Sequence, residues 1–406
     1  LLASRVYAVQ RQILEYQGPV SERLAIYGAT DLKLAFEFPL PGSFVARPAL
    51  HVAPDAQSAL LRFETGAPYQ GWLLRFDHLS GALADLAALW TEDAVALAPS
   101  GAGWLVYGSP QSPAGPRELY ELPFDPTLPP APLGIVGEDG PVAFDAAGVT
   151  AWLPTPPGPT GEPRMRHADV VTGQTLGRVT VGLPGERVEW AALVGERLFT
   201  GTTAGEFVFG EGRLHWVDTE SAPEVLGTLA LGMHSTRFGE WLDGPGALLV
   251  WGLQYGSGFE DTYRAFVVDP AQPAAPAAVP EVVGTNVSLQ DLGATIWVRD
   301  NCCGTTDFPL PSMVWHLDPA TGGLVAPPTP GLPGPILSGP AAQFPALAAT
   351  RDFTGEQVVL GHSVLHASPW NSIPDVLLRI DAATGVQSEH PVGFWSSHWL
   401  TGISIP

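Results

Sequence analysis

A short phrase that recurs along the chain constrains its fold more than any other feature. It consists of an apolar run typical of a β-strand, an aspartate, a turn rich in Pro, Ala, Thr or Gly, and a second such run. The phrase is clearest at residues 315–322 and 378–385, and weaker copies carry Asp77, Asp125, Asp169, Asp218 and Asp269. From Asp77 to Asp381, the successive aspartates lie 48, 44, 49, 51, 49 and 63 residues apart. A period near 48 residues is typical of a four-stranded β-propeller blade.

The chemistry of tight turns explains why these residue types recur. An aspartate at the first turn position accepts hydrogen bonds from the backbone N–H groups that follow it, proline presets φ at the next position, and glycine takes the position with positive φ. We therefore interpret the repeated aspartates as structural. The same reasoning predicts packing or hydrogen-bonding roles for His167, His215 and His316, which lie close to a repeat aspartate.

An eighth, divergent hairpin precedes the repeats, with strands at residues 23–27 and 32–38 and a turn at 28–31. The chain also ends in an unpaired strand-like piece at 394–400. A propeller has to remove its open edges, and the common solution pairs the last strand with strands near the N-terminus. We therefore predict an all-β fold, a single β-propeller domain over residues 1–406. Eight four-stranded antiparallel blades are favoured, and seven if the first hairpin packs outside the ring.

Composition limits the possible partners. Charged residues are only 15% of the 406 residues, and 46 Gly and 42 Pro fit many short strands joined by turns. The net charge of −22 argues against nucleic acid or an anionic membrane, and leaves cations such as Ca²⁺ and neutral ligands. No run of about 18 apolar residues occurs, so we expect no insertion into a membrane.

The location of the protein is predicted from weaker features. The sequence starts at Leu1 without a methionine, and Lys33 is the only lysine. Together with the proline-rich loops and a cysteine pair, this favours a secreted, periplasmic or cell-surface protein, although no signal peptide is visible. We expect a monomer.

Two of the turns carry a resemblance to a known family. The Asp-Pro-Ala-Thr-Gly turn at Asp318 and the Asp-Ala-Ala-Thr-Gly turn at Asp381 resemble the repeat of quinoprotein-type (PQQ-like) β-propellers, where the phrase joins the third and fourth strands of a blade. The resemblance implies the propeller fold and, for activity, a dehydrogenase of alcohols or sugars that uses PQQ and Ca²⁺. The tryptophan that usually follows Thr-Gly in this family is missing from both copies, which supports the fold more than the activity.

Placing four strands on each repeat predicts two unlike faces. Loops between second and third strands share a face with the blade-to-blade connections, and the aspartate turns lie on the opposite face. The second-to-third loops are unusually long, and loops on a rigid scaffold commonly carry binding sites. They fall at residues 109–117, 155–166, 202–212, 254–263, 299–312 and 361–375.

One of these loops holds the only two cysteines, Cys302 and Cys303, between strand-like runs at 294–298 and 312–317. Three interpretations remain open. The adjacent cysteines could form a strained vicinal disulfide, and such disulfides also occur in PQQ-dependent alcohol dehydrogenases. They could instead bind a metal, although adjacent thiolates are poorly spaced for one tetrahedral ion, or they could be inert thiols.

Polar and aromatic residues on the loop-rich face are the other candidates for a ligand site. Carboxylate and amide oxygens could bind Ca²⁺, and aromatic rings such as that of Phe259 could stack on a sugar. His362, His366 and His398 could converge near the closure of the ring. The complete predicted ligand-binding set is Tyr255, Glu260, Asp261, Arg299, Asp300, Asn301, Asp307, His362, His366, Trp370 and His398.

Two main classes of function follow, with one smaller possibility beside them. The first is a non-catalytic propeller that binds a small molecule, glycan or protein through its loop-rich face, since no Gly-x-Ser-x-Gly, His-Glu-x-x-His, P-loop or dinucleotide motif occurs in the sequence. The second is the quinoprotein-like dehydrogenase. A lyase or hydrolase built from histidines and carboxylates on separate loops is a third.

Overall fold

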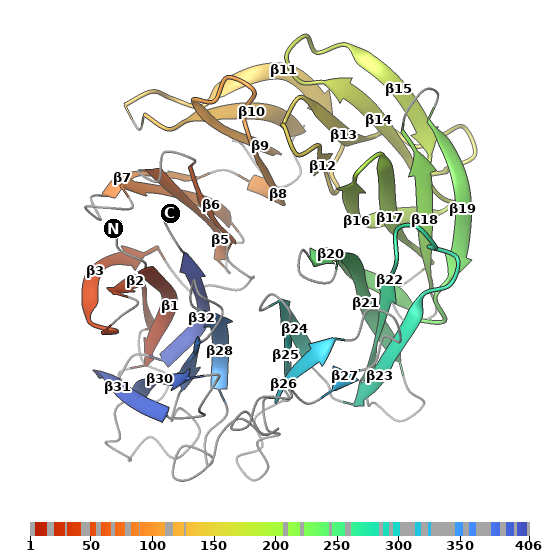
Figure 1. Cartoon of the computed structure of the whole chain (residues 1–406). Coiled ribbons are helices and arrows are strands. Elements are labelled where there is room, and N and C mark those ends of the chain that lie inside the picture. The colour runs from red at the N-terminus through yellow and green to blue at the C-terminus, as the bar shows by residue number, and fades with distance from the viewer. Residues whose placement is uncertain are drawn as a thin grey trace. The chain divides into compact units, whose positions relative to one another are not determined.

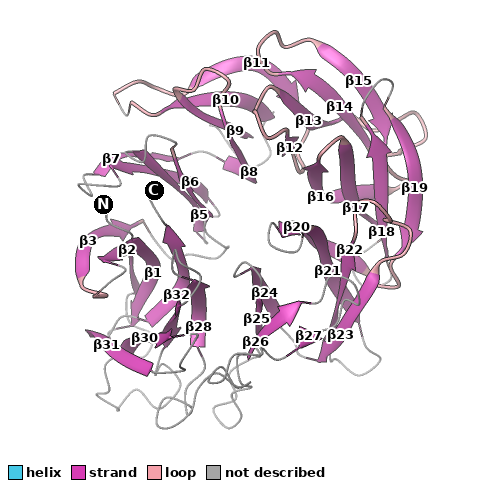
Figure 2. Cartoon of the chain, viewed as in Figure 1, coloured by secondary structure: helices cyan, strands magenta, loops and turns pink. Residues whose placement is uncertain are grey.

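A computed structural model shows a chain built of β-strands (Figures 1 and 2). Within the part of the chain that the structure describes, there are strands β1 to β32 and no helix, so no helix there is long and apolar enough to cross a membrane. The all-β prediction is confirmed. The described residues are 5–13, 20–28, 31–41, 49–53, 58–65, 70–77, 83–88, 90–109, 117–125, 127–205, 210–219, 223–242, 246–255, 261–283, 287–291, 295–300, 313–317, 324–325, 346–351, 357–362, 375–381, 387–393 and 396–403.

The strands form eight four-stranded antiparallel sheets, which we name A to H in chain order. The chain divides into two compact units: the first comprises Leu1–Asp85, Gly284–Leu317 and Leu324–Pro406, and the second comprises Leu86–Val283 and Asp318–Gly323. Sheets A, B, G and H belong to the first unit, with the boundary falling within β7. Sheets C, D, E and F make up the second unit.

The strands of the first unit are as follows. Sheet A holds β1 (Arg5–Ile13), β2 (Val20–Gly28), β3 (Leu34–Leu40) and β32 (Ser396–Ile403), and sheet B holds β4 (Ala49–Val52), β5 (Ser58–Thr65), β6 (Gln70–Asp77) and β7 (Leu83–Ala88). Sheet G holds β24 (Val287–Asp291), β25 (Thr295–Asp300), β26 (Met313–Leu317) and β27 (Leu324–Val325), and sheet H holds β28 (Ala346–Arg351), β29 (Gln357–His362), β30 (Asp375–Asp381) and β31 (Gln387–Gly393).

The second unit has the same organisation. Sheet C holds β8 (Trp90–Leu97), β9 (Gly103–Ser109), β10 (Arg117–Pro123) and β11 (Ala131–Gly137), and sheet D holds β12 (Ala143–Phe144), β13 (Thr150–Thr155), β14 (Arg164–Asp169) and β15 (Thr175–Thr180). Sheet E holds β16 (Glu186–Val194), β17 (Arg197–Ala204), β18 (Glu211–Asp218) and β19 (Glu224–Ala230), and sheet F holds β20 (Ser235–Leu242), β21 (Ala247–Tyr255), β22 (Asp261–Val268) and β23 (Ala277–Val283).

The repeat aspartates within the described part of the chain fall where the third strand of a sheet passes to the fourth, as the sequence predicts; Asp318 lies outside that part. Three show the expected turn chemistry, because a side-chain Oδ1 accepts a hydrogen bond from a backbone N–H two or three residues on. These bonds join Asp125 to Thr127 (2.9 Å), Asp169 to Thr172 (2.7 Å) and Asp269 to Ala271 (2.8 Å). The six long loops likewise lie between second and third strands.

Sheet A combines the two ends of the chain. The last strand, β32, pairs antiparallel with β1, and the sheet runs β3-β2-β1-β32, so the predicted pairing of the C-terminal strand is confirmed. One boundary was wrong: the sequence starts the next strand at Leu32, but this residue lies in the turn with φ of 50° and its side chain is buried. The closed ring, the number of blades in it and a single domain stay predictions.

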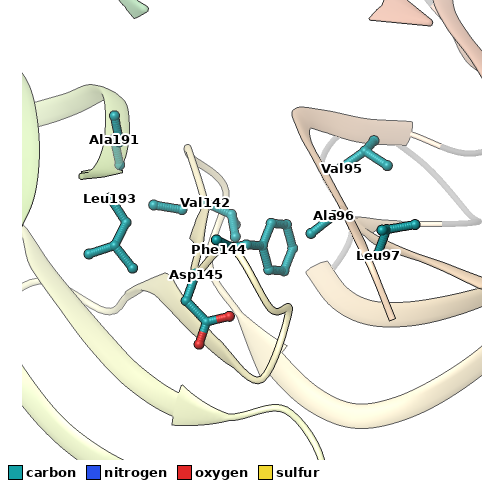
Figure 3. A pocket seen from close by; sticks show the side chains of 11 residues that line it. Val95, Ala96, Leu97, Val142, Phe144, Asp145, Ala191 and Leu193 are labelled. Carbon is teal, nitrogen blue, oxygen red and sulfur yellow. The ribbon is translucent and has the colours of Figure 1, made fainter. Parts of the chain in front are cut away.

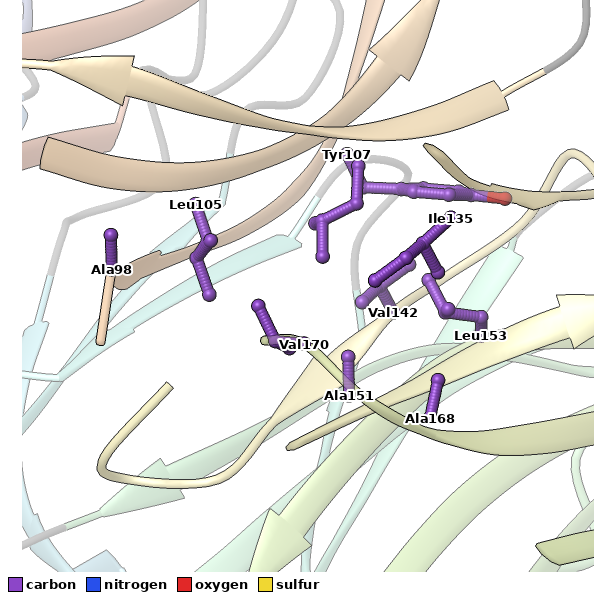
Figure 4. Packing of buried hydrophobic residues seen from close by; sticks show 10 residues of the cluster. Ala98, Leu105, Tyr107, Ile135, Val142, Ala151, Leu153, Ala168 and Val170 are labelled. Carbon is purple, nitrogen blue, oxygen red and sulfur yellow. The ribbon is translucent and has the colours of Figure 1, made fainter. Parts of the chain in front are cut away.

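Buried side chains connect neighbouring sheets within each unit. In the second unit, apolar clusters join sheets C to D, D to E and E to F. Figure 4 shows the first of these, in which Leu105 of β9 and Leu153 of β13 are fully buried. In the first unit Phe76 of β6 lies 5.9 Å from Tyr7 of β1, measured between ring centroids, and Leu377 of β30 packs with Val6. Burying one such side chain contributes about 1.5–3 kcal/mol.

At some positions two neighbouring sheets approach so closely that only glycine fits. Gly148 lies in the turn between β12 and β13 with φ of +66°, and a Cβ there would collide with the backbone oxygen of Leu97 in sheet C. Gly101 has a similar φ of +69°, but a Cβ there would meet nothing within 4 Å. The two glycines therefore separate the cost of backbone strain from the cost of a clash.

We expect Gly148→Ala to destabilise the protein far more than Gly101→Ala. Both substitutions place a Cβ on a left-handed backbone, which costs about 1–2 kcal/mol, but only Gly148→Ala also forces sheets C and D apart. Denaturant unfolding of the two variants and the wild type measures the difference. Equal losses of unfolding free energy would show that the junction of the two sheets tolerates movement.

Candidate functional site

For six of the residues that the sequence predicts to form the site, the structure describes the backbone only. Tyr255 ends β21 and Asp261 starts β22, while Arg299 and Asp300 end β25 and His362 ends β29, which puts these positions at the second-to-third loops. His398 instead lies within β32. The side chains of these six residues are outside the described part of the structure, as are Phe259, Glu260, Asn301, Cys302, Cys303, Asp307, His366 and Trp370 altogether. The disulfide, Ca²⁺, PQQ and ligand-binding assignments stay predictions.

The loop-rich side is described in detail where sheet D passes to sheet E. The loop between β13 and β14 and the connection between β15 and β16 are joined by two backbone hydrogen bonds. Val181 N donates to Pro163 O (3.0 Å), and Gly185 N donates to Gly161 O (3.1 Å). The loop and the connection, which follow different strands, are thus bonded to each other through their backbones.

The surface of the loop and the connection is largely apolar and stiff. Six of its side chains are exposed: four prolines, Leu183 at 52%, and the polar Thr160. Proline has a fixed φ and no backbone N–H, so this surface has little freedom to lose on binding. We call its apolar part the proline platform, and this part consists of Pro156, Pro157, Pro159, Leu183 and Pro184.

A buried carboxylate supports the platform from beneath. The Glu186 side chain is fully buried, and its Oε2 accepts hydrogen bonds from Leu183 N (2.9 Å) and Thr202 Oγ1 (3.0 Å). Its Oε1 accepts a charge-assisted hydrogen bond from Arg213. Since a buried charge is tolerated only when it is paired and hydrogen-bonded, these contacts determine where the connection lies.

His215 extends the network toward the outer strand. Its Nε2 lies 2.8 Å from Thr202 Oγ1 and 3.7 Å from Glu186 Oε2, and its Nδ1 lies 2.8 Å from Thr228 Oγ1 in β19. Burial lowers the pKa of His215 to about 4. The nearby Glu186 carboxylate raises this pKa by less than burial lowers it, and Arg213 lowers it further. The imidazole is therefore neutral at ordinary pH.

Thr202 and His215 do not form a catalytic pair, although the hydroxyl of one contacts the ring of the other. Thr202 is fully buried and His215 almost so, so no substrate reaches them. The prediction that His215 has a structural role is confirmed. It is confirmed for His167 too, whose ring stacks on Trp152 at 4.6 Å between centroids and 4° between planes. The side chain of His316 lies outside the described part.

The neighbouring connection, between sheets C and D, is also held by polar contacts, although its carboxylate is exposed. Arg117 Nη2 donates to Asp139 Oδ1 (2.7 Å), and the Arg117 side chain is nearly buried. Tyr107 OH donates to the backbone oxygen of Glu138 (2.7 Å). The connections from sheet C to D and from sheet D to E are therefore fixed by polar contacts from the strands.

A second feature is a hollow of about 350 Å³ at the other end of the sheets, where the first strands β8, β12 and β16 turn into the second strands (Figure 3); its side chains are mostly apolar, but its exposed lining is not. It exists because β12 has only two residues and much of the lining is alanine. Asp145 at its edge is engaged by its own turn, with hydrogen bonds from Val149 N (2.8 Å) and Thr150 N (3.0 Å). The hollow offers volume but no reactive group.

The sequence reasoning located the loop of the platform but missed Glu186 and Arg213. A Pro-Pro-Gly-Pro-Thr-Gly-Glu-Pro run within 155–166 was the available signal for a stiff loop. No local pattern marks Glu186, because its side-chain partners Thr202 and Arg213 lie 16 and 27 residues away.

Comparisons with known proteins give distant structural similarities. BamB from Moraxella catarrhalis is 14% identical over 95% of this chain and 93% of its own, with a TM-score of 0.46. The β-propeller domain of the Trilobed protease from Pyrococcus furiosus is 8% identical over 86% of this chain and 98% of its own, with a TM-score of 0.45. A eukaryotic initiation factor is 10% identical over 98% of both chains, with a TM-score of 0.44.

No protein-family model matches the chain, and no curated protein matches it. Neither a family nor an activity follows from these similarities.

Replacing the buried carboxylate should be costly. Glu186→Gln keeps the shape of the side chain but places a buried amide donor among donors, while Arg213 keeps its pairing with the partly exposed Glu211, so we expect a loss of about 1–3 kcal/mol in unfolding free energy. The matched control is Glu37→Gln, which removes the half-exposed partner of Arg23 and should cost less than about 1 kcal/mol. Denaturant unfolding measures both, and a similar small loss for each would refute the anchoring role of Glu186.

The neutral state of His215 predicts a pH dependence. Its pKa is about 4 in the folded protein, against about 6.5 when unfolded, so below pH 6.5 the unfolded chain binds the proton first. Stability should therefore fall as the pH drops from about 6.5 to about 4, by at most about 1.4 kcal/mol per pH unit for this group. His215→Gln should reduce that slope in denaturant unfolding.

The pKa of His51 is lowered to about 4 as well, mainly by burial, so the wild-type slope contains both histidines. Only the difference between the wild type and His215→Gln reports on His215. If the two proteins lose equal stability between pH 7 and pH 5, His215 titrates normally and the interpretation of the network is wrong.

Proposed function

We propose that this chain is a β-propeller scaffold that binds a partner protein through its loop-rich side and catalyses no reaction. In this proposal the eight sheets are blades of one ring, and the pairing of β32 with β1 closes it. The single observation that carries the binding role is the proline platform. It is an exposed apolar surface held in place by a buried ionic network.

The chemistry of the platform favours a protein as the partner. Prolines and one leucine offer stacking and apolar contact but few hydrogen-bond donors, which suits aromatic and aliphatic side chains. Because Leu183 is fixed through its own backbone N–H, little conformational entropy remains to be lost on association. The net charge of −22 makes nucleic acid an unfavourable partner.

The other predicted candidates extend this proposal to the rest of the loop-rich side. Tyr255, Asp261, Asp300 and His362 occupy corresponding topological positions in sheets F, G and H. In the proposal they add specificity for a small-molecule, glycan or protein ligand. A secreted or periplasmic location and a monomeric state belong to the same proposal.

Site-specific crosslinking tests the platform directly. A photoreactive amino acid replaces Leu183 in one variant and Leu176 in another, and each is irradiated in cells that produce the protein. Leu176 is equally exposed, at 49%, but lies on the outer strand β15. We expect a discrete protein adduct at position 183 that is absent at 176 and is lost when Pro157→Asp is added.

Identical adducts at both positions would contradict a specific platform. The enzyme alternative is tested separately by adding PQQ and Ca²⁺ to the purified protein, since a ligand that binds only the folded state raises the melting temperature. A rise would favour the quinoprotein-like dehydrogenase over the non-catalytic scaffold.

A further inference from the structure

The outermost strand of each sheet has a neighbour on one side only. In the second unit these strands are β11, β15, β19 and β23. An edge strand presents a row of unpaired N–H and C=O groups, and natural proteins protect such edges with prolines, charges or covering groups. The four edges can therefore be compared for how each is protected.

Three of the four edges carry such protection. Strand β11 contains Pro132, and Arg166 of sheet D donates to its Val136 oxygen (2.9 Å). Strand β23 contains Pro280. Strand β15 contains the charged Arg178, and Pro223, the residue directly before β19, lies against its Gly177, where a Cβ would be 2.6 Å from the proline ring.

Strand β19 is different. Its sequence, Glu-Val-Leu-Gly-Thr-Leu-Ala, has one charge at its first residue and neither a proline nor a charge after it. It lies at the periphery of sheet E (Figure 1), and within the described part of the chain its backbone ladder involves β18 alone. Among the described residues, no hydrogen bond covers its outward edge.

The strand is also held in a fixed register. The Trp216 indole packs so closely on Gly227 that a Cβ there would collide with it, and Thr228 is hydrogen-bonded to His215. Exposed residues alternate with half-buried ones along the strand, and Leu226 is 50% exposed. The edge is thus preorganised and partly apolar.

We propose that the outward edge of β19 binds an extended segment of a partner protein as a fifth strand of sheet E. Another peptide backbone matches a row of alternating donors and acceptors and displaces the water that otherwise bonds to it, and alternate side chains would supply specificity. Leu226 favours an apolar residue beside it, and Glu224 favours a basic one. A second copy of this chain is disfavoured because each copy carries a net charge of −22.

The proposal does not depend on the proline platform, because it uses a different surface and a different mode of binding. Its test uses the purified full chain and a fluorescent, acetylated peptide of alternating valine and threonine that ends in lysine. The lysine then lies opposite Glu224 in an antiparallel pairing. We expect saturable binding by fluorescence anisotropy and slower hydrogen exchange at those amides of residues 224–230 that point away from β18.

Two matched variants locate the binding. Leu226→Lys places a charge on the β19 edge and should weaken binding at least about tenfold. Leu176→Lys makes the same change on β15, at a side chain with nearly the same exposure, and should leave binding unchanged. Melting curves that match the wild type show that both variants remain folded.

Three outcomes would overturn the proposal. One is no saturable binding up to about 1 mM peptide, which corresponds to a binding free energy weaker than about −4 kcal/mol. Another is equal weakening by Leu226→Lys and Leu176→Lys. The third is self-association of the chain that Leu226→Lys abolishes, which would make a second copy the occupant of this edge.

Discussion

Burial of the Glu186 carboxylate is the interaction on which the described part of the loop-rich side depends. A carboxylate removed from water destabilises the fold by several kcal/mol unless cations and donors compensate it. Its compensation comes from three places: the connection that carries Leu183, the second strand with Thr202, and the third strand with Arg213. The position of the surface above is therefore set by the electrostatics below it.

This dependence explains how an irregular segment can be stiff. The connection between sheets D and E has no strand of its own, yet its backbone is bonded to the Glu186 side chain on one side and to the β13–β14 loop on the other. The connection between sheets C and D uses Arg117 and Asp139 for the same purpose. Loops fixed in this way can present apolar side chains without collapsing onto the sheet.

The parts of the fold that local chemistry determines could be predicted from the sequence. The turn aspartates, such as Asp169 and Asp269, were placed correctly because their hydrogen bonds involve residues within the same turn. Leu32 was misplaced because an apolar side chain normally marks a strand, whereas here it fills the core from a turn with positive φ. Glu186 was missed because its partners come together only after the sheet forms.

Pairing β32 with β1 and protecting the sheet edges are separate problems in this fold. Pairing β32 with β1 joins the ends of the chain in sheet A, but it leaves the outer strand of every sheet with one neighbour. Each outer edge therefore needs its own protection, which in the second unit comes from Pro132, Arg178 and Pro280 on three strands. Strand β19 has no proline, and no charge after its first residue, to protect its edge, yet contacts with Trp216 and His215 hold it in place. An edge strand that is already ordered and is not protected loses little conformational entropy when it pairs with another strand.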